Sequence, residues 1–348
     1  MTSTIHAVSL SPTLHGAGSL AALVQYAAPR SVDDALALAR VLGTQEQHSP
    51  CSTLDRWEAL ATLAAHDVAA ARAVEPHLDA LGILHEANVS RLDAETDDVT
   101  ELLWGVFAAE GGDEPLTATT ADDGSVTLSG RKPWCSLAGR LDVALVTARL
   151  HNAGGERGLF AVRLDGPGVD VDDAAWFARG LTEIPSGPVR FTAVPAEPIG
   201  AAGWYLEREG FAWGGVGVAA CWYGGAVGIA RRVHAAVVDA SNPHSLAHLG
   251  AIDELLQSAR RALHEAAQLV AVEGIDARVV AKRVRATVAR ASDEIMVRAL
   301  RALGPAPLAL DAAFAKRVAD LQLYLRQHHA ERDEASLGTA LSAEAAPW

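Results

Sequence analysis

Cysteine is scarce in this chain of 348 residues, and its scarcity restricts both the fold and the chemistry. The three cysteines, Cys51, Cys135 and Cys221, lie far apart and form no Cys-x-x-Cys pair. A disulfide framework or a structural zinc site needs paired or clustered cysteines, so neither is expected. Separated thiols are typical of a reducing compartment, and the sequence therefore predicts a cytoplasmic protein.

Basic residues are also in short supply. The chain has 29 Lys and Arg against 43 Asp and Glu, which gives a formal net charge of −14. Proteins that bind nucleic acid present a basic stripe or patch to the phosphates, and no long basic stretch occurs here. We therefore expect no nucleic-acid partner.

Uncharged runs of membrane-spanning length are limited to one segment. Residues 211–230 contain no charge over twenty positions, about the length that crosses a bilayer. This segment holds six glycines, and Arg231 and Arg232 follow it directly. Small residues allow helices to pack closely, so we expect a central helix of a bundle and no membrane partner. The N-terminal MTSTIHAVSLSP lacks the pattern of a signal peptide.

Three segments of different pattern follow one another along the chain. Residues 1–101 show apolar spacing typical of helices, and residues 201–348 return to it in long amphipathic stretches. Between them, residues 102–200 contain short Val, Leu and Phe runs broken by turn signals. Consecutive strands without intervening helices predict an antiparallel sheet or barrel. The expected fold class is α+β with three domains over these ranges.

Local signals set the expected helix boundaries. Pro76 suits the first turn of a new helix, with Glu75 beside its N-terminus. Gly304, followed by prolines, is a stop signal for the helix before it. A final helix is predicted over about residues 311–335.

The order of these segments and several motifs resemble the acyl-CoA dehydrogenase family, as a divergent member of actinobacterial type. LSGRKPWCSLAGRLDVALVTAR, residues 128–149, is similar to the family's strand motif of Gly-x-Lys, an aromatic, a small residue and Ser or Thr. FAAEGGDEPLTA, residues 107–118, sits where the family has Thr-Glu-Pro-x-x-Gly-Ser-Asp. The resemblance implies an N-terminal helical domain, a middle β-domain and a C-terminal four-helix bundle, with FAD between the last two.

The same resemblance implies the cofactor site. Trp134 would stack on the flavin, and Ser136 would donate a hydrogen bond near its reactive nitrogen, with Cys135 between them. Ala109 and Glu110 fall in the second flavin-binding stretch. A flat ring covers a flat cofactor, and a short hydroxyl tunes it without filling the substrate cavity. The family further implies a small-molecule substrate, an acyl-CoA or other acyl thioester, and a homodimer or homotetramer.

Several family residues are missing, which leaves the reaction open. Neither usual position of the catalytic Glu holds a carboxylate: the first bundle helix has none, and His328 stands at the other, with Glu331 three residues beyond. The Arg-x-x-Phe-Gly stretch that grips the FAD pyrophosphate is replaced by NPHSLAHLG, residues 242–250. Three hypotheses follow: a dehydrogenase, a flavin-dependent monooxygenase of the same fold, and a non-catalytic or flavin-free subunit that pairs with a paralogue.

His328 is the candidate catalytic residue, because it shares the inward face of the last predicted helix with Leu321 and Leu325. It is either a base or hydrogen-bond donor at the flavin, or a hydrogen-bonded core histidine. In the monooxygenase hypothesis His77 joins it, although the charges around His77 also fit a helix-start network, at Arg72, Glu75 and Asp79.

No metal site is expected. His244 and His248 have metal-binding spacing, but they lack an intervening Glu and a third ligand. The glycines at 214, 215 and 217 do not follow a strand, so they form no dinucleotide fingerprint.

Overall fold

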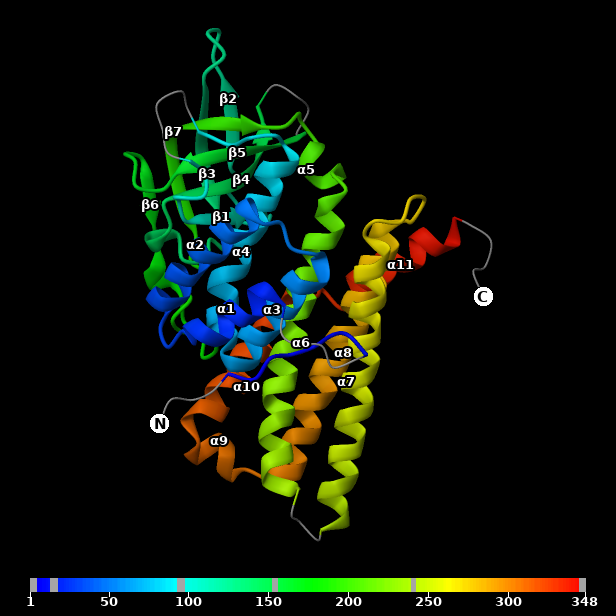
Figure 1. Cartoon of the computed structure of the whole chain (residues 1–348). Helices are drawn as coiled ribbons and strands as arrows, with labels where there is room; N and C mark the ends of the chain where they lie inside the picture. The colour runs from blue at the N-terminus through cyan, green and yellow to red at the C-terminus, as the bar shows by residue number, and fades with distance from the viewer. Residues whose placement is uncertain (1–4, 13–17, 93–97, 152–155, 239–241, 344–348) are drawn as a thin grey trace.

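A computed structural model describes residues 5–12, 18–92, 98–151, 156–238 and 242–343. A β-domain lies at one end of the molecule, and two groups of helices lie beneath it (Figure 1). One group comes from the N-terminal third of the chain and the other from the C-terminal third. This is the helix, sheet, helix order that the sequence predicts.

The N-terminal third forms four helices, each begun by a short polar residue or a glycine. Ser31 and Ser52 accept backbone hydrogen bonds at the starts of α2 and α3, and Asp67 does so for α4. Helix α4 continues through Pro76, so the predicted helix start at that residue is wrong; the helix begins eight residues earlier, at the Asp67 cap. The elements are α1 (Ser19–Ala27), α2 (Val32–His48), α3 (Thr53–His66) and α4 (Val68–Glu86).

The middle third forms one seven-stranded sheet. Most neighbouring strands are antiparallel, as predicted, but β1 and β2 each pair parallel with β4. Strand β4 is buried almost throughout and lies between β1 and β5, which explains its unbroken apolar sequence. The strands are β1 (Trp104–Phe107), β2 (Thr117–Thr120), β3 (Val126–Lys132), β4 (Val143–Leu150), β5 (Arg157–Arg163), β6 (Val169–Val171) and β7 (Val189–Ile199).

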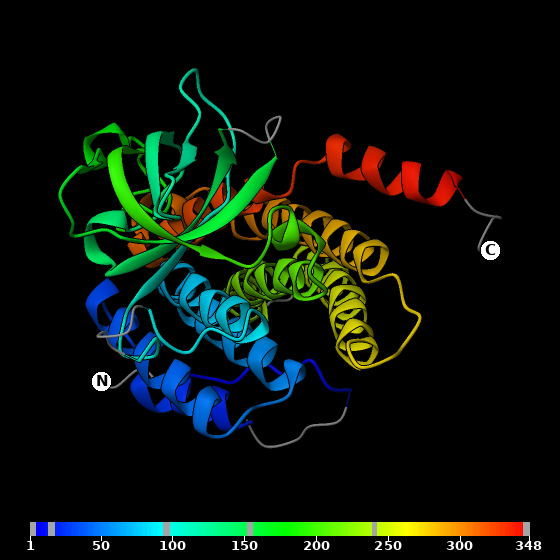
Figure 2. The same ribbon diagram turned by 90° about the horizontal axis from the view of Figure 1, so that it is seen from above.

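The C-terminal third is built around α6. Helices α7, α8 and α10 pack against α6, and α3 and α4 cover its other side (Figure 2). No helix among the described residues is long and apolar enough to cross a membrane. Helix α8 ends before Gly304, as predicted. The helices are α5 (Trp204–Glu207), α6 (Gly210–Val237), α7 (Pro243–Leu269), α8 (Ala277–Leu303), α9 (Ala306–Leu310), α10 (Ala312–Tyr324) and α11 (Glu331–Ser342).

The glycines of α6 explain its composition. A methyl group at Gly224 would overlap the carbonyl oxygen of Ala61, so α3 and α6 approach at backbone contact. The uncharged segment is therefore a packing helix inside the protein rather than a span.

The prediction of one helix over residues 311–335 is wrong, because the helix is interrupted near its middle. Helix α10 ends at Tyr324, a single 3-10 turn covers Leu325–Gln327, and α11 begins at Glu331. His328 sits in the break with extended backbone, φ −88° and ψ 119°. Helix α11 then leaves the body of the molecule (Figure 2).

Lys316 of α10 joins the three regions through a cluster of carboxylates. Its Nζ lies 3.1 Å from Asp67, 2.9 Å from Glu183 and 2.6 Å from Asp320. Asp320 is almost fully buried and also accepts a hydrogen bond from the Leu181 backbone. The ammonium group thus fills the space between three carboxylates that would otherwise repel one another.

Replacing Lys316 with methionine is expected to lower the free energy of unfolding by about 2 kcal/mol, because it leaves buried Asp320 without its cation. Urea denaturation followed by circular dichroism measures the change. Lys282→Met serves as the control, since that half-buried lysine makes one long contact to a carbonyl oxygen, at 3.4 Å. Equal midpoints for the two variants would contradict a stabilising role for the cluster.

Candidate functional site

A first cavity of about 600 Å³ opens at the edge of the β-domain. Trp134 stands in its wall with 59% of its surface exposed, and the Trp176 ring meets it edge to face at 6.2 Å. Arg131 contributes a cationic side chain and Ser186 a hydroxyl. The volume is within the range of small-molecule and cofactor sites.

The backbone at Trp134 is held in an unusual conformation. Its φ is 60°, in the left-handed region that bulky residues rarely adopt. Such a conformation costs on the order of 1–3 kcal/mol and persists where the surroundings enforce it. Here the Cys135 backbone N–H donates to the Gly187 carbonyl, which ties the turn to the loop before β7. The indole is therefore presented to the cavity at a cost in stability.

A second cavity of about 300 Å³ lies between α3, α4 and α6. Its wall is rich in charge, which is unusual for a space between helices. The carboxylates come mainly from α4, and glycines of α6 leave room opposite them. The charged lining residues are Arg56, Glu75, Asp79, Glu86 and Arg208.

Hydrogen bonds connect the two cavities. Ser186, in the wall of the first, has its Oγ 2.7 Å from Ser136 Oγ and donates to the Ile184 carbonyl. Arg72 of α4 donates to Ser136 Oγ at 3.0 Å and approaches Glu75 at 3.5 Å. Because Glu75 lines the second cavity, a continuous polar chain runs from one cavity to the other.

Glu75 is a buried carboxyl group at the end of this chain of hydrogen bonds. Its pKa is raised to about 7, mainly by burial and in smaller part by the nearby Asp79, while Arg72 opposes the shift. The Tyr324 hydroxyl reaches Glu75 at 3.4 Å. A carboxyl group with this pKa is divided between its two forms at neutral pH, so it is able both to accept and to donate a proton.

His328 is buried at the helix break, as its predicted inward position requires. The His328 ring meets the Trp222 ring edge to face, with 6.4 Å between the ring centroids. The Arg285 guanidinium lies over the same Trp222 ring, 4.7 Å from its centroid. Burial lowers the pKa of His328, and its Nε2 has no partner among the described residues. His328 lines neither cavity, so the structure does not bring it together with Trp134.

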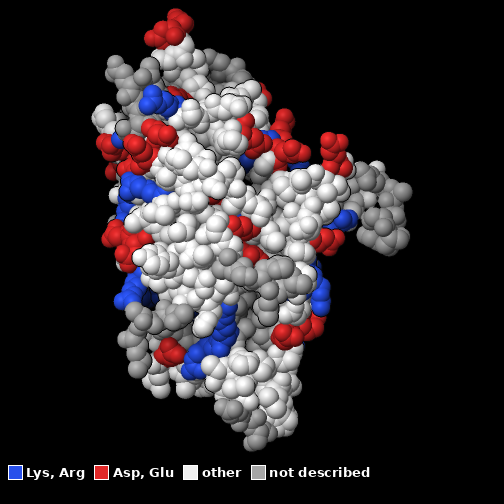
Figure 3. Space-filling view, viewed as in Figure 1, with Lys and Arg blue, Asp and Glu red and all other residues white. Residues whose placement is uncertain are grey.

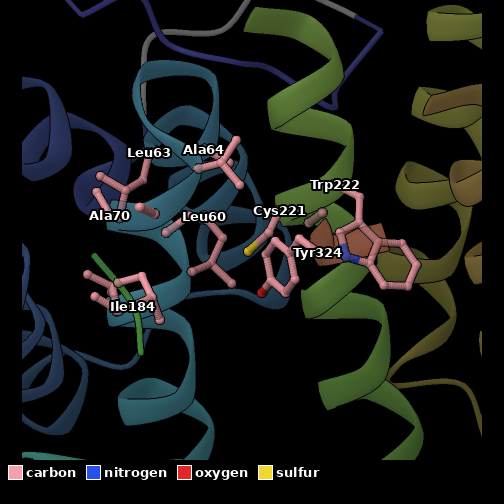
Figure 4. Close-up of a cluster of buried hydrophobic side chains, with 14 of the residues drawn as sticks. Leu60, Leu63, Ala64, Ala70, Ile184, Cys221, Trp222 and Tyr324 are labelled. Atoms are coloured by element: carbon pink, nitrogen blue, oxygen red, sulfur yellow. The ribbon is translucent and has the colours of Figure 1, made fainter. Parts of the chain in front are cut away.

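The neighbourhood of Trp222 is mostly apolar. Figure 4 shows Tyr324 between Cys221 and Trp222, facing the α3 side chains. Tyr324 and Trp222 are in edge-to-face contact at 6.4 Å. This core packs around Tyr324, whose hydroxyl reaches Glu75.

The other predicted flavin contacts lie outside the first cavity. Cys135 is fully buried, donates to the Lys132 carbonyl, and has a pKa raised by burial to about 12. Glu110 binds the buried Lys132 ammonium at 3.0 Å, and Ala109 precedes it at the end of the strand region. Ser136 lies one side chain behind the wall, and Ser186 is the hydroxyl residue that lines the cavity.

His77 occupies the opposite side of α4 from Glu75. It is fully buried, and its Nδ1 accepts a hydrogen bond from the Trp104 backbone at 3.3 Å. Burial lowers its pKa to about 4, so it is neutral at physiological pH. It lines neither cavity.

Comparison with known proteins agrees with the fold. Residues 111–194 match the family model for the acyl-CoA dehydrogenase middle domain. The chain has the acyl-CoA dehydrogenase fold. Comparison with curated protein sequences gives no match. Similarity to solved structures extends over nearly the whole chain at low sequence identity, so the chain is a divergent example of the fold.

Three solved structures illustrate the similarity. TdsC from Paenibacillus sp. A11-2, with FMN and indole, is 18% identical with TM-score 0.78 and coverage of 94% of this chain and 97% of its own. KijD3, with FMN and a dTDP-amino sugar, is 20% identical with TM-score 0.77 and coverage of 97% of both chains. Butyryl-CoA dehydrogenase from Megasphaera elsdenii is 17% identical with TM-score 0.77 and coverage of 94% and 100%.

The charged face that α4 turns to the second cavity is not evident from the sequence. Arg72, Glu75 and Asp79 were attributed to the start of a helix, because Pro76 suggested one there. Since α4 continues through Pro76, these residues lie three and four positions apart on one face. That spacing was the available signal. Ser186 carried no signal, because only the fold brings the loop before β7 to Ser136.

Proposed function

We propose that this protein is a flavin-dependent oxidoreductase of dehydrogenase type. Trp134 would hold the flavin ring in the first cavity, the substrate would extend from the second cavity to that ring so that its hydride reaches the flavin directly, and Glu75 would exchange the proton. The observation that carries this proposal is the position of Glu75, a carboxyl group with a pKa of about 7 that lines the second cavity and is joined to Ser136 through Arg72. It supplies the acid–base group that is missing from both usual positions.

The first cavity fits a flavin. A large aromatic ring is exposed in its wall at Trp134, and a flat cofactor would cover it. Gly111 and Gly112 line the same space, and a Cβ at either would meet nothing within 4 Å, so the backbone leaves room for a ligand. Trp134 and Trp176 would hold the ring system, and Ser186 would offer its oxygen.

A bound flavin supplies a two-electron acceptor for a hydride. The protein contributes the positioning and the proton transfer. Arg72 holds Ser136 and Glu75 from one side, and Tyr324 holds Glu75 from the other. Glu75 in its ionised form takes a proton from a substrate in the second cavity, where the protein shields it from bulk water.

FMN is the proposed flavin rather than FAD. The segment at 242–250 lacks the Arg and Phe of the pyrophosphate-binding stretch, and the similar structures of TdsC and KijD3 both contain FMN. Arg131 is placed to meet the single phosphate, because it lines the first cavity and its guanidinium is exposed.

Changing Arg131 to alanine is expected to weaken FMN binding about tenfold, through loss of one charge-assisted contact. Riboflavin, which has no phosphate, should bind both proteins equally. Titration followed by flavin fluorescence measures the constants. The control is Arg149→Ala, which changes another exposed arginine away from this cavity. The same loss with riboflavin would contradict a phosphate contact.

Anaerobic reduction separates the dehydrogenase proposal from its alternatives. A dehydrogenase substrate bleaches bound flavin in the absence of oxygen, whereas a monooxygenase requires prior reduction and oxygen. The dibenzothiophene monooxygenase TdsC makes the second reaction the alternative to test. An acyl thioester is the substrate that the resemblance implies, and butyryl-CoA is the first compound to add. Flavin that stays oxidised with every compound, but forms an oxygen-dependent product after reduction, would replace the proposal with monooxygenation.

A protein that binds no flavin at all would favour the non-catalytic subunit. The expected location is the cytoplasm, supported by Cys51, Cys135 and Cys221 all being free thiols. A homodimer or homotetramer remains the expected assembly.

A further inference from the structure

The second cavity owes its space to α6. Gly210, Gly214 and Gly217 of that helix line it, at positions that share one helical face. A Cβ at Gly214 would lie 2.7 Å from the Asp79 carboxylate, so a side chain there would press on that group. Trp57 and Trp213 complete the walls and could contact an apolar ligand. Such a ligand would leave the charged side chains of the cavity without polar partners, so it does not suit this site.

The charges around this cavity pair off unevenly. Arg56 binds Glu46 at 2.7 Å, and Arg208 binds Glu86 at 2.7 Å. Glu75 has Arg72 at 3.5 Å. Asp79 is left with the already engaged Arg208, at 3.8 Å, as its one ion-pair contact among the described residues.

The negative charge of Asp79 is therefore only weakly neutralised by its neighbours, so a cation would bind favourably beside it. It keeps a quarter of its side-chain surface, 25%, and it lines the cavity. Burial raises its pKa and Glu86 raises it further, whereas Arg208 and Arg56 oppose the shift. A positively charged ligand in the cavity would reverse the effect of burial.

A second group in the wall also lacks a partner. The Arg208 side chain is only 4% exposed, yet its Nε has no hydrogen-bond acceptor among the described residues. Arg208 lines the cavity beside Asp79. A buried N–H of this kind favours an oxygen acceptor in the same space.

We infer that the second cavity binds a small primary amine that also carries an oxygen acceptor, with the ammonium at Asp79 and the oxygen at Arg208. This inference rests on the proposed function only in taking the second cavity as the substrate side. It replaces the apolar acyl group expected from the fold with a polar, cationic substrate class.

Ethanolamine is the probe, because it holds an ammonium and a hydroxyl two carbons apart. Calorimetric titration of the full chain is expected to give a dissociation constant on the order of 1 mM, as suits so small a molecule. Ethylene glycol, which lacks the charge, and butyrate, which carries the opposite charge and an acyl chain, should bind at least tenfold more weakly. Butyrate binding as tightly as ethanolamine would overturn the inference.

Asp79→Asn keeps the shape of the side chain and removes its charge. It should weaken ethanolamine binding at least tenfold, and the control Asp170→Asn, in the exposed strand β6, should leave it unchanged. An equal loss of ethanolamine affinity in both variants would mean that the net charge of the protein alone attracts the amine, and it would overturn the site. The comparison of probes on the unaltered protein tests the inference even if Asp79→Asn fails to fold.

FMN titration of the same sample keeps the two proposals apart. Flavin binding without ethanolamine binding would overturn the amine site and leave the flavin proposal standing. Ethanolamine binding without flavin would support the amine site and contradict the proposed function.

Discussion

Replacing Trp134 with glycine will weaken FMN binding and, at the same time, raise the melting temperature of the flavin-free protein. Stacking of a flat heterocycle on an aromatic side chain contributes about 1–3 kcal/mol, so losing the ring should cost about 5- to 140-fold in affinity. The gain in stability comes from the backbone, because glycine adopts the φ of 60° at this position without strain. Relief of about 1 kcal/mol corresponds to roughly 2 °C.

Trp134→Ala is the matched control for this pair of effects. Alanine removes the same ring but keeps the left-handed strain, so it should lose FMN equally and gain no melting temperature. Tyr26→Ala, at an exposed ring on α1, controls for removal of any surface aromatic. Fluorescence titration and thermal unfolding give the two readouts. FMN affinity unchanged in both Trp134 variants would place the flavin elsewhere.

The strand and helix patterns were predictable because each reflects local burial. Strand β4 reads as an unbroken apolar run because sheet neighbours and helices cover it, and α8 ends where Gly304 takes a φ of 69°. The break at 325–330 was not predictable from spacing, since Leu321, Leu325 and His328 continue the helical period across it. Tertiary packing decides that the chain turns there, and periodicity does not report it.

The candidate site was only partly predictable, for a related reason. Trp134 follows from a local motif, and the structure places it in a cavity wall. Glu75 depends on a contact from α10 and, through Arg72, on Ser136 of the β-domain, both distant in sequence. The charged face of α4 resembles a solvent-exposed face until α6 is known to cover it, and Figure 3 shows many charges that do lie on the surface.

Glu75 should make the protein less stable as the pH rises. Its pKa is about 7 when folded, above the ordinary value of 4.5 in the unfolded chain, so the folded state holds the extra proton between these values. Stability is therefore full below pH 4.5 and falls until pH 7, by about 3 kcal/mol. The groups that face Glu75 are Arg72 and Asp79 of α4, Tyr205 of α5, Cys221 of α6, Arg285 of α8 and Tyr324 of α10.

Glu75→Gln should remove this loss, since the amide stays neutral at every pH. At pH 8 the variant is expected to be more stable than the parent by up to about 3 kcal/mol, and at pH 4 the two should be equal. Glu331→Gln, at an exposed carboxylate in the first turn of α11, is the control and should change neither value. Urea unfolding at the two pH values measures the difference. An equal gain at pH 4 would point to packing instead of charge.

Glu75→Gln should also abolish most of the activity, although the variant stays folded. Loss of a positioned acid–base group lowers turnover by about 10²- to 10⁴-fold, while FMN affinity should not change because Trp134 and Arg131 remain. Anaerobic flavin bleaching gives the rate, with whichever compound reduces the parent protein. In the parent the rate should rise with pH through about 7, as Glu75 loses its proton, and the variant should lose that dependence. A variant that is stabler, binds FMN normally and reacts as fast as the parent would show that Glu75 only packs. A slow variant with a flat pH profile would identify the carboxylate of α4 as the base that replaces both missing positions.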